Sequence, residues 1–334
     1  MGHSSVIFPV DPYLARLRRL TEDFRKNRLQ RLAGRRNHDI VTELEEFLFV
    51  DQRFRLPDFV TSNLPNKAVV DNPGVWEKPS TAYLNSVLVS KIGIPATLAI
   101  IVGDLLRRLM TSGELDCFCK VRCGAMDGIP SIDIIEDIVV QDSQVILNPC
   151  SYDALREMLR YLIRSYWPFP WETGHAKHQS GGFESAVNNF IDGQASSAES
   201  EAISRTAKHR LERGIWTSPG AGDLRLCVAS CERLVLIDQM MGDKFSLGLA
   251  RANLSILYCH IGLYSEAMAE IRESIELLGD MNESKHATIC LKLLKFLAAQ
   301  GVQSQQRANL LTPSTQKERC LSMMEETVIL PLTW

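Results

Sequence analysis

Apolar positions recur along this chain mostly at three- and four-residue intervals, a spacing that predicts amphipathic helices. The first helix is predicted over 12–34, with Pro12 near its start, and the second over 38–51. The inward-facing positions are Leu14, Leu17, Leu20 and Phe24 in the first helix and Leu44, Phe47 and Leu48 in the second. The first helix is basic and the second is acidic, so we expect the two to pair.

The most apolar part of the chain is a pair of helices separated by a Gly-Ile-Pro break at 93–95. The second of these helices, 93–110, carries charges only towards its far end, which predicts burial. Short runs rich in β-branched residues follow, and they predict strands. These runs are 115–123, 132–135, 138–140 and 145–147. We therefore expect the apolar helix to pack against a small sheet.

The second half of the chain is predicted to be almost wholly helical. A strongly amphipathic helix covers 152–166, and Arg156, Arg160 and Arg164 are expected on its outer face. The stretch 174–204 is rich in Gly, Ser, Asn, Gln and Ala, a composition typical of linkers. From 205 onward we expect helices, among them 223–241 and 287–299.

Residues 251–279 show a helix-turn-helix pattern that is similar to a tetratricopeptide repeat. Its positions are Leu254, Ser255 and Tyr258 on the first helix, Gly262 and Tyr264 at the turn, and Ala267, Ile271 and Ser274 on the second helix. Small residues at Ser255 and Ala267 let the two helices cross closely. The flanking helices fit the same pattern more loosely, so a short stack of repeats is expected.

Three motifs resemble the SirB-type branch of the transglutaminase-like superfamily. They are Leu84-Asn85, Gly93-Ile94-Pro95 and Arg107-Arg108-Leu109. The resemblance implies a papain-like α/β core in which the apolar helix is central, and SirB-type proteins typically end in a short helical-repeat region. The expected fold class is thus α+β and mostly helical: a papain/transglutaminase-like core with N-terminal helices, followed by an all-α helical-repeat domain.

A chain of 334 residues is long enough for two compact domains. We expect an N-terminal helical segment at 1–60, a transglutaminase-like domain at 61–173, a linker at 174–204 and a tetratricopeptide-like domain at 205–334. The net charge of −3 argues against a globally basic nucleic-acid binder, and nine cysteines do not form a small secreted disulfide framework. The longest uncharged apolar run, 92–103, is too short for a membrane span of about 20 residues.

These features predict an intracellular soluble protein with no transmembrane segment. The cytoplasm fits the sequence. A plastid stroma also fits it, if the visible start is a processed or alternative one, because repeat-bearing SirB-type proteins occur in photosynthetic organisms.

The catalytic chemistry of the superfamily needs a Cys thiolate at the start of the central helix and a His within hydrogen-bond reach. Here Pro95 stands at the place of the nucleophile, and there is no His between His38 and His175. We therefore predict a protein that is not an enzyme. The alternative hypothesis is a cysteine-dependent hydrolase or transferase with a rearranged site at Cys150, served by His175 or His178.

No metal and no cofactor are predicted. Cys117, Cys119 and Cys123 lie close together in the sequence, but no fourth Cys or His lies nearby to complete a structural zinc site. No phosphate-binding or dinucleotide-binding glycine motif occurs in the chain.

The leading functional hypothesis is a non-catalytic scaffold, adaptor or assembly factor. Its protein partners are expected to bind the helical repeats, at a groove that includes Asn253, Tyr258 and Tyr264. The basic first helix, through residues such as Arg16, Arg19 and Arg28, is a second candidate that would dock on an acidic surface. No aromatic side chain interleaves with its arginines on the polar face, so nucleic acid is not the expected partner.

Overall fold

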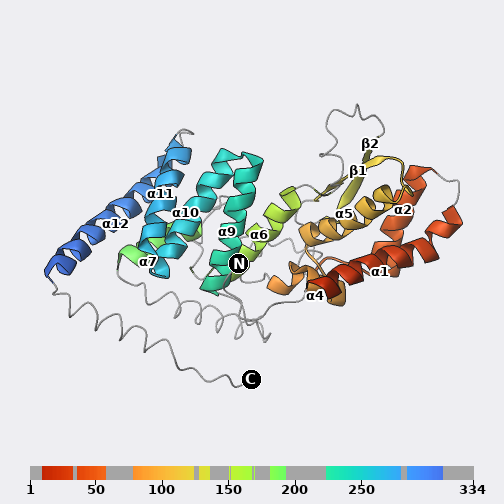
Figure 1. The fold of residues 1–334 in the computed structure, drawn as a ribbon, viewed down its shortest axis with the longest axis horizontal. Helices are drawn as coiled ribbons and strands as arrows, with labels where there is room; N and C mark the ends of the chain where they lie inside the picture. Colours follow the sequence, from red (N-terminus) through yellow and green to blue (C-terminus); the bar gives the residue numbers. More distant parts are fainter. Residues whose placement is uncertain are drawn as a thin grey trace, which may run out of the picture.

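The structure is a computed structural model. It describes residues 10–32, 36–57, 78–123, 128–135, 150, 152–167, 169, 181–192, 223–279 and 284–310. Within these ranges the chain is mostly helical, and a sheet of two strands accompanies the helices. The molecule is elongated, with the first helices and the sheet at one end, an array of helices at the other and α6 between them (Figure 1). The expectation of a mostly helical α+β chain is confirmed at this level.

The N-terminal unit begins with two oppositely charged helical segments. Its helical elements are α1 (Asp11–Asn27), the 3-10 turn η1 (Leu29–Leu32), α2 (Asn37–Glu46), the π-helical turn η2 (Phe47–Asp51), the 3-10 turn η4 (Pro79–Thr81), α4 (Leu84–Ser90) and α5 (Pro95–Thr111). Arg28, just after α1, binds Glu43 of α2 and Asp51 of η2, each at 2.8 Å. The expected pairing of the basic and acidic segments is therefore confirmed, although α1 ends earlier than predicted.

The helix α5 is the centre of this unit. Lys91 ends α4 in a left-handed conformation (φ 61°), and Pro95 starts α5, which accounts for the break between the two helices. Gly93 is required in this break, because a Cβ there would lie 2.7 Å from Cγ1 of Val87. Ala99 is fully buried, as are most apolar side chains of α5, so the prediction of a buried helix is confirmed.

The sheet lies against α5. It consists of β1 (Phe118–Arg122) and β2 (Ser131–Ile135), which pair antiparallel. Two of the four predicted strands are thus confirmed, and those at 138–140 and 145–147 lie outside the described residues. Cys150 adds one parallel bridge on the other side of β1, opposite Val121.

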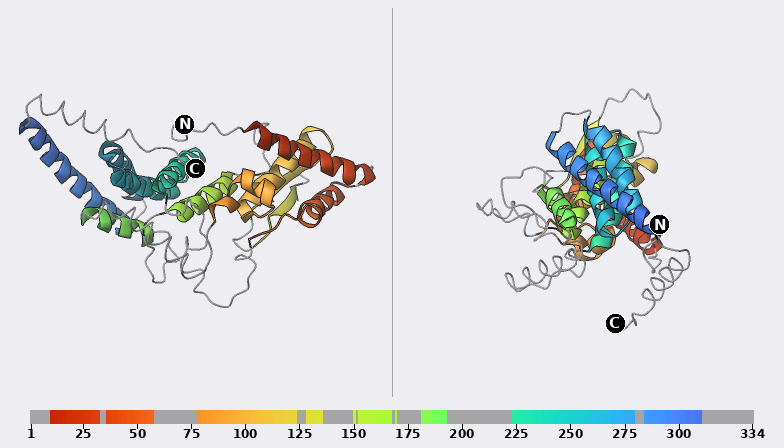
Figure 2. Two further views of the ribbon diagram at one scale, coloured as in Figure 1. Left: turned by 90° about the horizontal axis from the view of Figure 1, so that it is seen from below. Right: turned by 90° about the vertical axis from the view of Figure 1, so that its left-hand side faces the viewer.

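The second half of the molecule is an array of helices that pack one against the next (Figures 1 and 2). The helices are α6 (Tyr152–Tyr166), α7 (Gly181–Ile191), α9 (Leu224–Met241), α10 (Lys244–His260), α11 (Tyr264–Gly279) and α12 (Ser284–Leu310). Asp223 caps α9 by accepting hydrogen bonds from two backbone N–H groups. Gly242 and Gly262, with φ of 71° and 82°, make the turns after α9 and α10.

The predicted helix-turn-helix over 251–279 is confirmed as α10 and α11. Ser255 and Ala267 are fully buried where these helices meet, as the sequence indicated. A third small residue adds to the close approach: a Cβ on Gly248 would lie 2.9 Å from the side chain of Leu278. The hydroxyl of Ser274 on α11 donates a hydrogen bond to the Gly248 carbonyl at 2.8 Å.

The stretch 174–204, which was predicted to be a linker, contains a helix. This helix, α7, packs against α10 and α12 and buries four apolar side chains. They are Phe183, Ala186, Val187 and Phe190. Their spacing is the i, i+3, i+4, i+7 pattern of an amphipathic helix. The polar composition of the whole stretch masked that pattern.

The helix α6 connects the two halves of the molecule. Its residue Ala154 belongs to the hydrophobic cluster around α5, whereas Leu159, Leu162 and the following apolar residues belong to the cluster of the helical array. The first cluster also includes α1 and α2, so the segment 1–60 shares its core with the residues that follow it. None of the described helices is both long and apolar enough to cross a membrane.

The prediction that the three arginines of α6 lie on an outer face is wrong for Arg156. This side chain is only 9% exposed and bridges α6 to the helical array. Its Nε lies 2.6 Å from Asp238 at the end of α9, and a terminal nitrogen lies 2.6 Å from Asp243, which caps α10. The periodicity of α6 could not show that α9 and the start of α10 cover Arg156.

Candidate functional site

The start of α5 is the place where a transglutaminase-like nucleophile would lie. Pro95 and Ala96 are buried there. The next residue, Thr97, is fully buried, and its hydroxyl donates a hydrogen bond to the Ala82 carbonyl at 3.0 Å. The hydroxyl is thus engaged with the backbone. Among the described residues, the helix start holds no thiol.

Cys150, the alternative nucleophile, lies against the middle of α5. A Cβ built on Gly103 would be 2.6 Å from the Cβ of Cys150, so the two residues are in close contact. Gly103 follows Pro95 by eight residues, which places Cys150 about 12 Å along the helix axis from the helix start. The positive end of the helix dipole, which lowers the pKa of a thiol, therefore does not act on Cys150 at short range.

Burial and the neighbouring carboxylate of Asp153 raise the pKa of Cys150 to about 11. Burial also raises the pKa of Cys123 to about 12, with the nearby Cys150 adding to the effect. The candidate bases His175 and His178 lie outside the described residues. The described surroundings of Cys150 thus favour a protonated, unreactive thiol.

We expect Cys150 to react slowly with alkylating reagents at pH 6–8. With a pKa near 11, roughly a thousandth of this thiol is ionised at pH 8, and the rate should keep rising with pH beyond that value. Mass spectrometry of the folded chain after timed alkylation measures the rate, and the urea-denatured chain serves as the control. Fast reaction at pH 6 that is lost in the variants His175→Ala and His178→Ala would contradict this expectation and favour a hydrolase.

Cys119 lies in β1, and Cys117 and Cys123 flank this strand. Cys117 and Cys119 approach each other, with their sulfur atoms 3.7 Å apart. Burial, and next the proximity of Cys117, raise the pKa of Cys119 to about 12. No group of three or more His, Cys, Asp or Glu among the described residues has the geometry to hold an ion.

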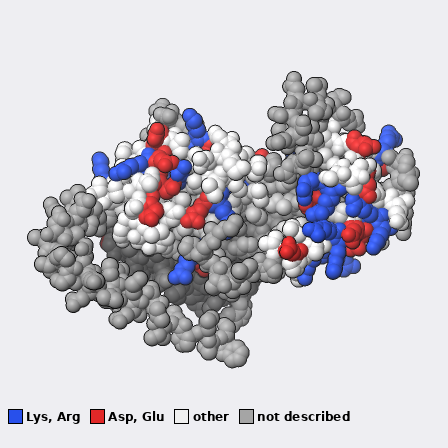
Figure 3. Space-filling view, viewed as in Figure 1, with Lys and Arg blue, Asp and Glu red and all other residues white. Residues whose placement is uncertain are grey.

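The three arginines chosen on the first helical segment have different surroundings. Arg28 is engaged by Glu43 and Asp51, and the hydrogen bonds that it donates to Asp51 raise its pKa despite partial desolvation. Arg16 and Arg19 are exposed on α1. Basic side chains gather over α1 and α5, with acidic ones among them (Figure 3). The surface of α1 is therefore charged, but Arg28 is part of an internal ion-pair network.

The three residues predicted to line the repeat groove are not together on one face. Tyr258 points to α9, where its hydroxyl donates a hydrogen bond to Glu232 at 2.8 Å. Burial, followed by this hydrogen bond, raises the pKa of Tyr258. Asn253 instead lines a small hollow beside Phe183 of α7. Tyr264 is 51% exposed, and its ring centroid lies 6.1 Å from that of Phe190, also on α7.

Two of these three residues therefore lie where α7 meets the array. The hollow that Asn253 lines has a volume of about 10 Å³, which is room for about one water molecule. The repeat face that was expected to be open thus already holds a helix of the same chain. The spacing of the four buried residues of α7 was the available signal in the sequence.

No protein-family model, no curated protein and no solved structure matches this chain. The fold and the geometry of these surfaces are therefore the grounds on which a function is proposed.

Proposed function

We propose that this chain is a non-catalytic interaction protein, a scaffold, adaptor or assembly factor. In this proposal a papain-like, SirB-type transglutaminase unit without a working catalytic centre is joined to a tetratricopeptide-like array. The array binds protein partners, as stacked helix pairs do in repeat proteins. The chain acts inside the cell, in the cytoplasm or a plastid stroma.

The observation that carries the proposal is the helical array itself. The helices α9 to α12 pack in chain order, and large apolar side chains remain exposed on this unit. On α9, Leu236 is 61% exposed and Met240 is 67% exposed, and on the turn before α11 Leu263 is 40% exposed. Exposed apolar side chains that are grouped on a helix favour contact with another protein.

The surroundings of α5 support the absence of catalysis. The helix start is occupied by Pro95 and by a Thr97 hydroxyl that is bound to the backbone. Cys150 is partly buried and lies against Gly103, and its pKa is raised to about 11. The eight cysteines among the described residues are free thiols, which fits a reducing compartment.

Photo-cross-linking from single positions tests which surface binds the partner. A photoreactive amino acid replaces Leu236 on α9 or, in a matched chain, the exposed Arg19 on α1, and each protein is irradiated in native extract at low and at high salt. We expect a defined cross-linked partner from position 236 at both salt concentrations, because apolar packing is hardly screened. Cross-links only from position 19, lost at high salt, would instead assign the function to charge-driven docking of α1.

A further inference from the structure

The helix α7 has the form of a bound helical ligand. Its four buried side chains, Phe183, Ala186, Val187 and Phe190, are each 7% exposed or less. They place two aromatic rings seven residues apart with two smaller side chains between them. This is the spacing with which amphipathic helices fill apolar grooves of partner proteins.

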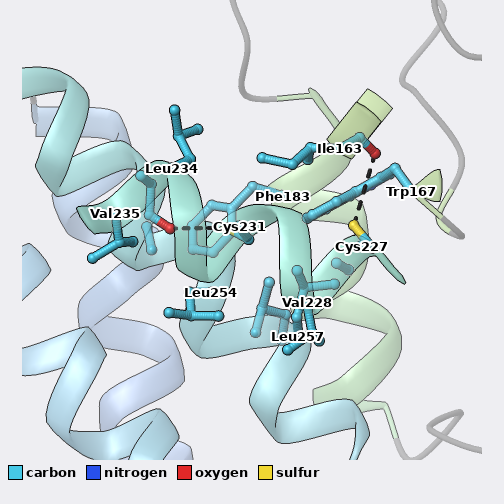
Figure 4. Close-up of a cluster of buried hydrophobic side chains, with 14 of the residues drawn as sticks. Ile163, Trp167, Phe183, Cys227, Val228, Cys231, Leu234, Val235, Leu254 and Leu257 are labelled. Atoms are coloured by element: carbon cyan, nitrogen blue, oxygen red, sulfur yellow. Dashed lines mark hydrogen bonds between the residues drawn. The ribbon is translucent and has the colours of Figure 1, made fainter. Parts of the chain in front are cut away.

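The receiving surface is formed by alternate helices of the array. α7 packs against α10 and α12, which α11 separates in chain order. The ring of Phe190 packs edge-on against His260 of α10 and Phe296 of α12, with centroid distances of 5.4 and 5.7 Å. At the other end of α7, Phe183 points into the apolar cluster that contains Trp167 and Leu257 (Figure 4). The rings of Phe183 and Phe190 thus pack into two separate sites on the array.

Two polar contacts that hold α7 place few demands on its sequence. The Nε2 of His260 lies 3.1 Å from the backbone carbonyl of Ala186, and such a contact is open to any residue at that position. The ammonium of Lys292 on α12 donates a hydrogen bond to the side-chain oxygen of Asn188 at 2.9 Å. The surface therefore selects the spacing of apolar side chains, together with one acceptor two residues before the second aromatic ring.

The helix α7 depends on its docking for its structure. It has 11 residues, fewer than the roughly 12–15 at which an isolated helix becomes even marginally stable in water. Because α7 is covalently attached, its effective concentration at the face formed by α10 and α12 is on the order of millimolar. A partner helix with the same features must therefore compete with a tethered ligand.

We propose that α7 is an internal ligand of the face formed by α10 and α12. The partner binds this face by displacing α7, as an amphipathic helix with aromatic side chains seven residues apart, small apolar residues between them and a hydrogen-bond acceptor facing Lys292. This inference rests on the proposed interaction function and names the site and the partner's chemistry. It also accounts for the positions of Asn253 and Tyr264 beside α7.

The experiment measures binding of a fluorescent peptide with the sequence of residues 181–192 to the full-length chain. The wild type is compared with the double variant Phe183→Ala/Phe190→Ala and with a control, Ser185→Ala, on a less buried position of α7. We expect the double variant to bind the peptide at least ten-fold more tightly than the wild type, because its own α7 no longer competes. The control should match the wild type, and a peptide with the same two alanines should not bind.

Each of the other outcomes overturns the proposal. If the double variant loses its cooperative thermal transition, α7 is a permanent part of the core. If it folds but binds the peptide no better, the face takes no helix of this kind. If sedimentation shows a dimer of the wild type that the double variant abolishes, the occupant is α7 of a second copy. Persistent cross-links from position 236 in any of these cases would leave the interaction function standing while the α7 site fails.

Discussion

Replacing Arg156 by Met is expected to lower the free energy of unfolding by about 3–5 kcal/mol, the typical cost of leaving one partner of a buried ion pair alone. The side chain of Asp238 is only 1% exposed. Its carboxylate oxygen Oδ1 lies 2.6 Å from Nε of Arg156. Without the guanidinium this carboxylate would be buried with its charge uncompensated. Urea unfolding followed by circular dichroism measures the change.

The control is Arg160→Met, the same substitution one turn later on α6. Arg160 is 22% exposed, forms a surface ion pair with Glu157 and donates a hydrogen bond to Ser246 of α10 at 3.1 Å, so losing it should cost about 1–2 kcal/mol, less than the loss of Arg156. The double variant Arg156→Met/Asp238→Leu should recover most of the stability, because apolar replacements of a buried ion pair are often neutral. Equal losses from Arg156→Met and Arg160→Met would contradict the assignment of Arg156 to a buried bridge.

The pH dependence gives an independent check on this bridge. Burial raises the pKa of Asp238, and Arg156 opposes that rise. Removing Arg156 leaves only the charge of Arg160 to oppose the rise in the pKa of Asp238, so the folded variant binds a proton at a pH at which the unfolded chain has already released it. The difference in the free energy of unfolding between the wild type and Arg156→Met should therefore shrink as the pH is lowered from 7 towards 5.

The pKa of the neighbouring Asp243 is shifted in the opposite direction: it is lowered in the wild type, whereas that of Asp238 is raised. Burial alone would raise its pKa, but hydrogen bonds from Arg156 and Ser246 outweigh burial and hold the pKa at about 2. The stability that Asp243 contributes is thus present above about pH 4 and is lost as the pH falls towards 2. The titration of Asp238 and that of Asp243 therefore affect stability in different pH ranges.

Ala99→Asp is expected to be the most damaging single substitution in the N-terminal unit. Ala99 is fully buried at the centre of α5, within the apolar cluster that α1, α2 and β1 share. A carboxylate there would have no described partner, and unpaired buried charges are among the changes that cost about 4 kcal/mol or more. Thermal and urea unfolding of the full chain measure the effect.

Ala99→Gly is the matched control at the same position. It removes one methyl group and lowers helix propensity, for an expected cost of about 1 kcal/mol. A large difference between the two variants shows that burial of charge, and not disturbance of the helix, is responsible. If Ala99→Asp unfolds like the wild type, α5 is not the buried central helix of this unit.

The sequence alone predicted the elements whose pattern is local. The apolar run of α5, the Gly-Ile-Pro break before it and the helix-turn-helix of α10 and α11 all came from residue spacing, and the structure confirms them. The pairing of the basic and acidic segments was also predicted, but Arg28, which was assigned to partner binding, is engaged with Glu43 and Asp51 of the same chain. The transglutaminase-like and tetratricopeptide-like interpretations remain predictions.

Other features depended on which surfaces meet. The composition of 174–204 is polar on average and concealed the helical spacing of Phe183 and Phe190, whose docking on α10 and α12 shows that this stretch contains the helix α7. Arg156 follows the same periodicity as Arg160, but its surroundings are set by Asp238, 82 positions further along the chain. The residues predicted to line one groove also depend on contacts between distant segments. Tyr258 contacts Glu232 on α9, whereas Asn253 lies beside Phe183 of α7.

One physical cause separates the features that the sequence predicted from those that only the tertiary structure shows. Backbone propensity and hydrophobic periodicity act over a few residues, so the sequence by itself predicted most of the helices, the strands β1 and β2, and the absence of a thiol at Pro95. Burial of a charge, or of a short helix with a polar surface, depends on contacts between distant segments. Only the tertiary structure therefore decided that Arg156 bridges α6 to the helical array, that Cys150 lies against the middle of α5, and that α7 occupies the face formed by α10 and α12.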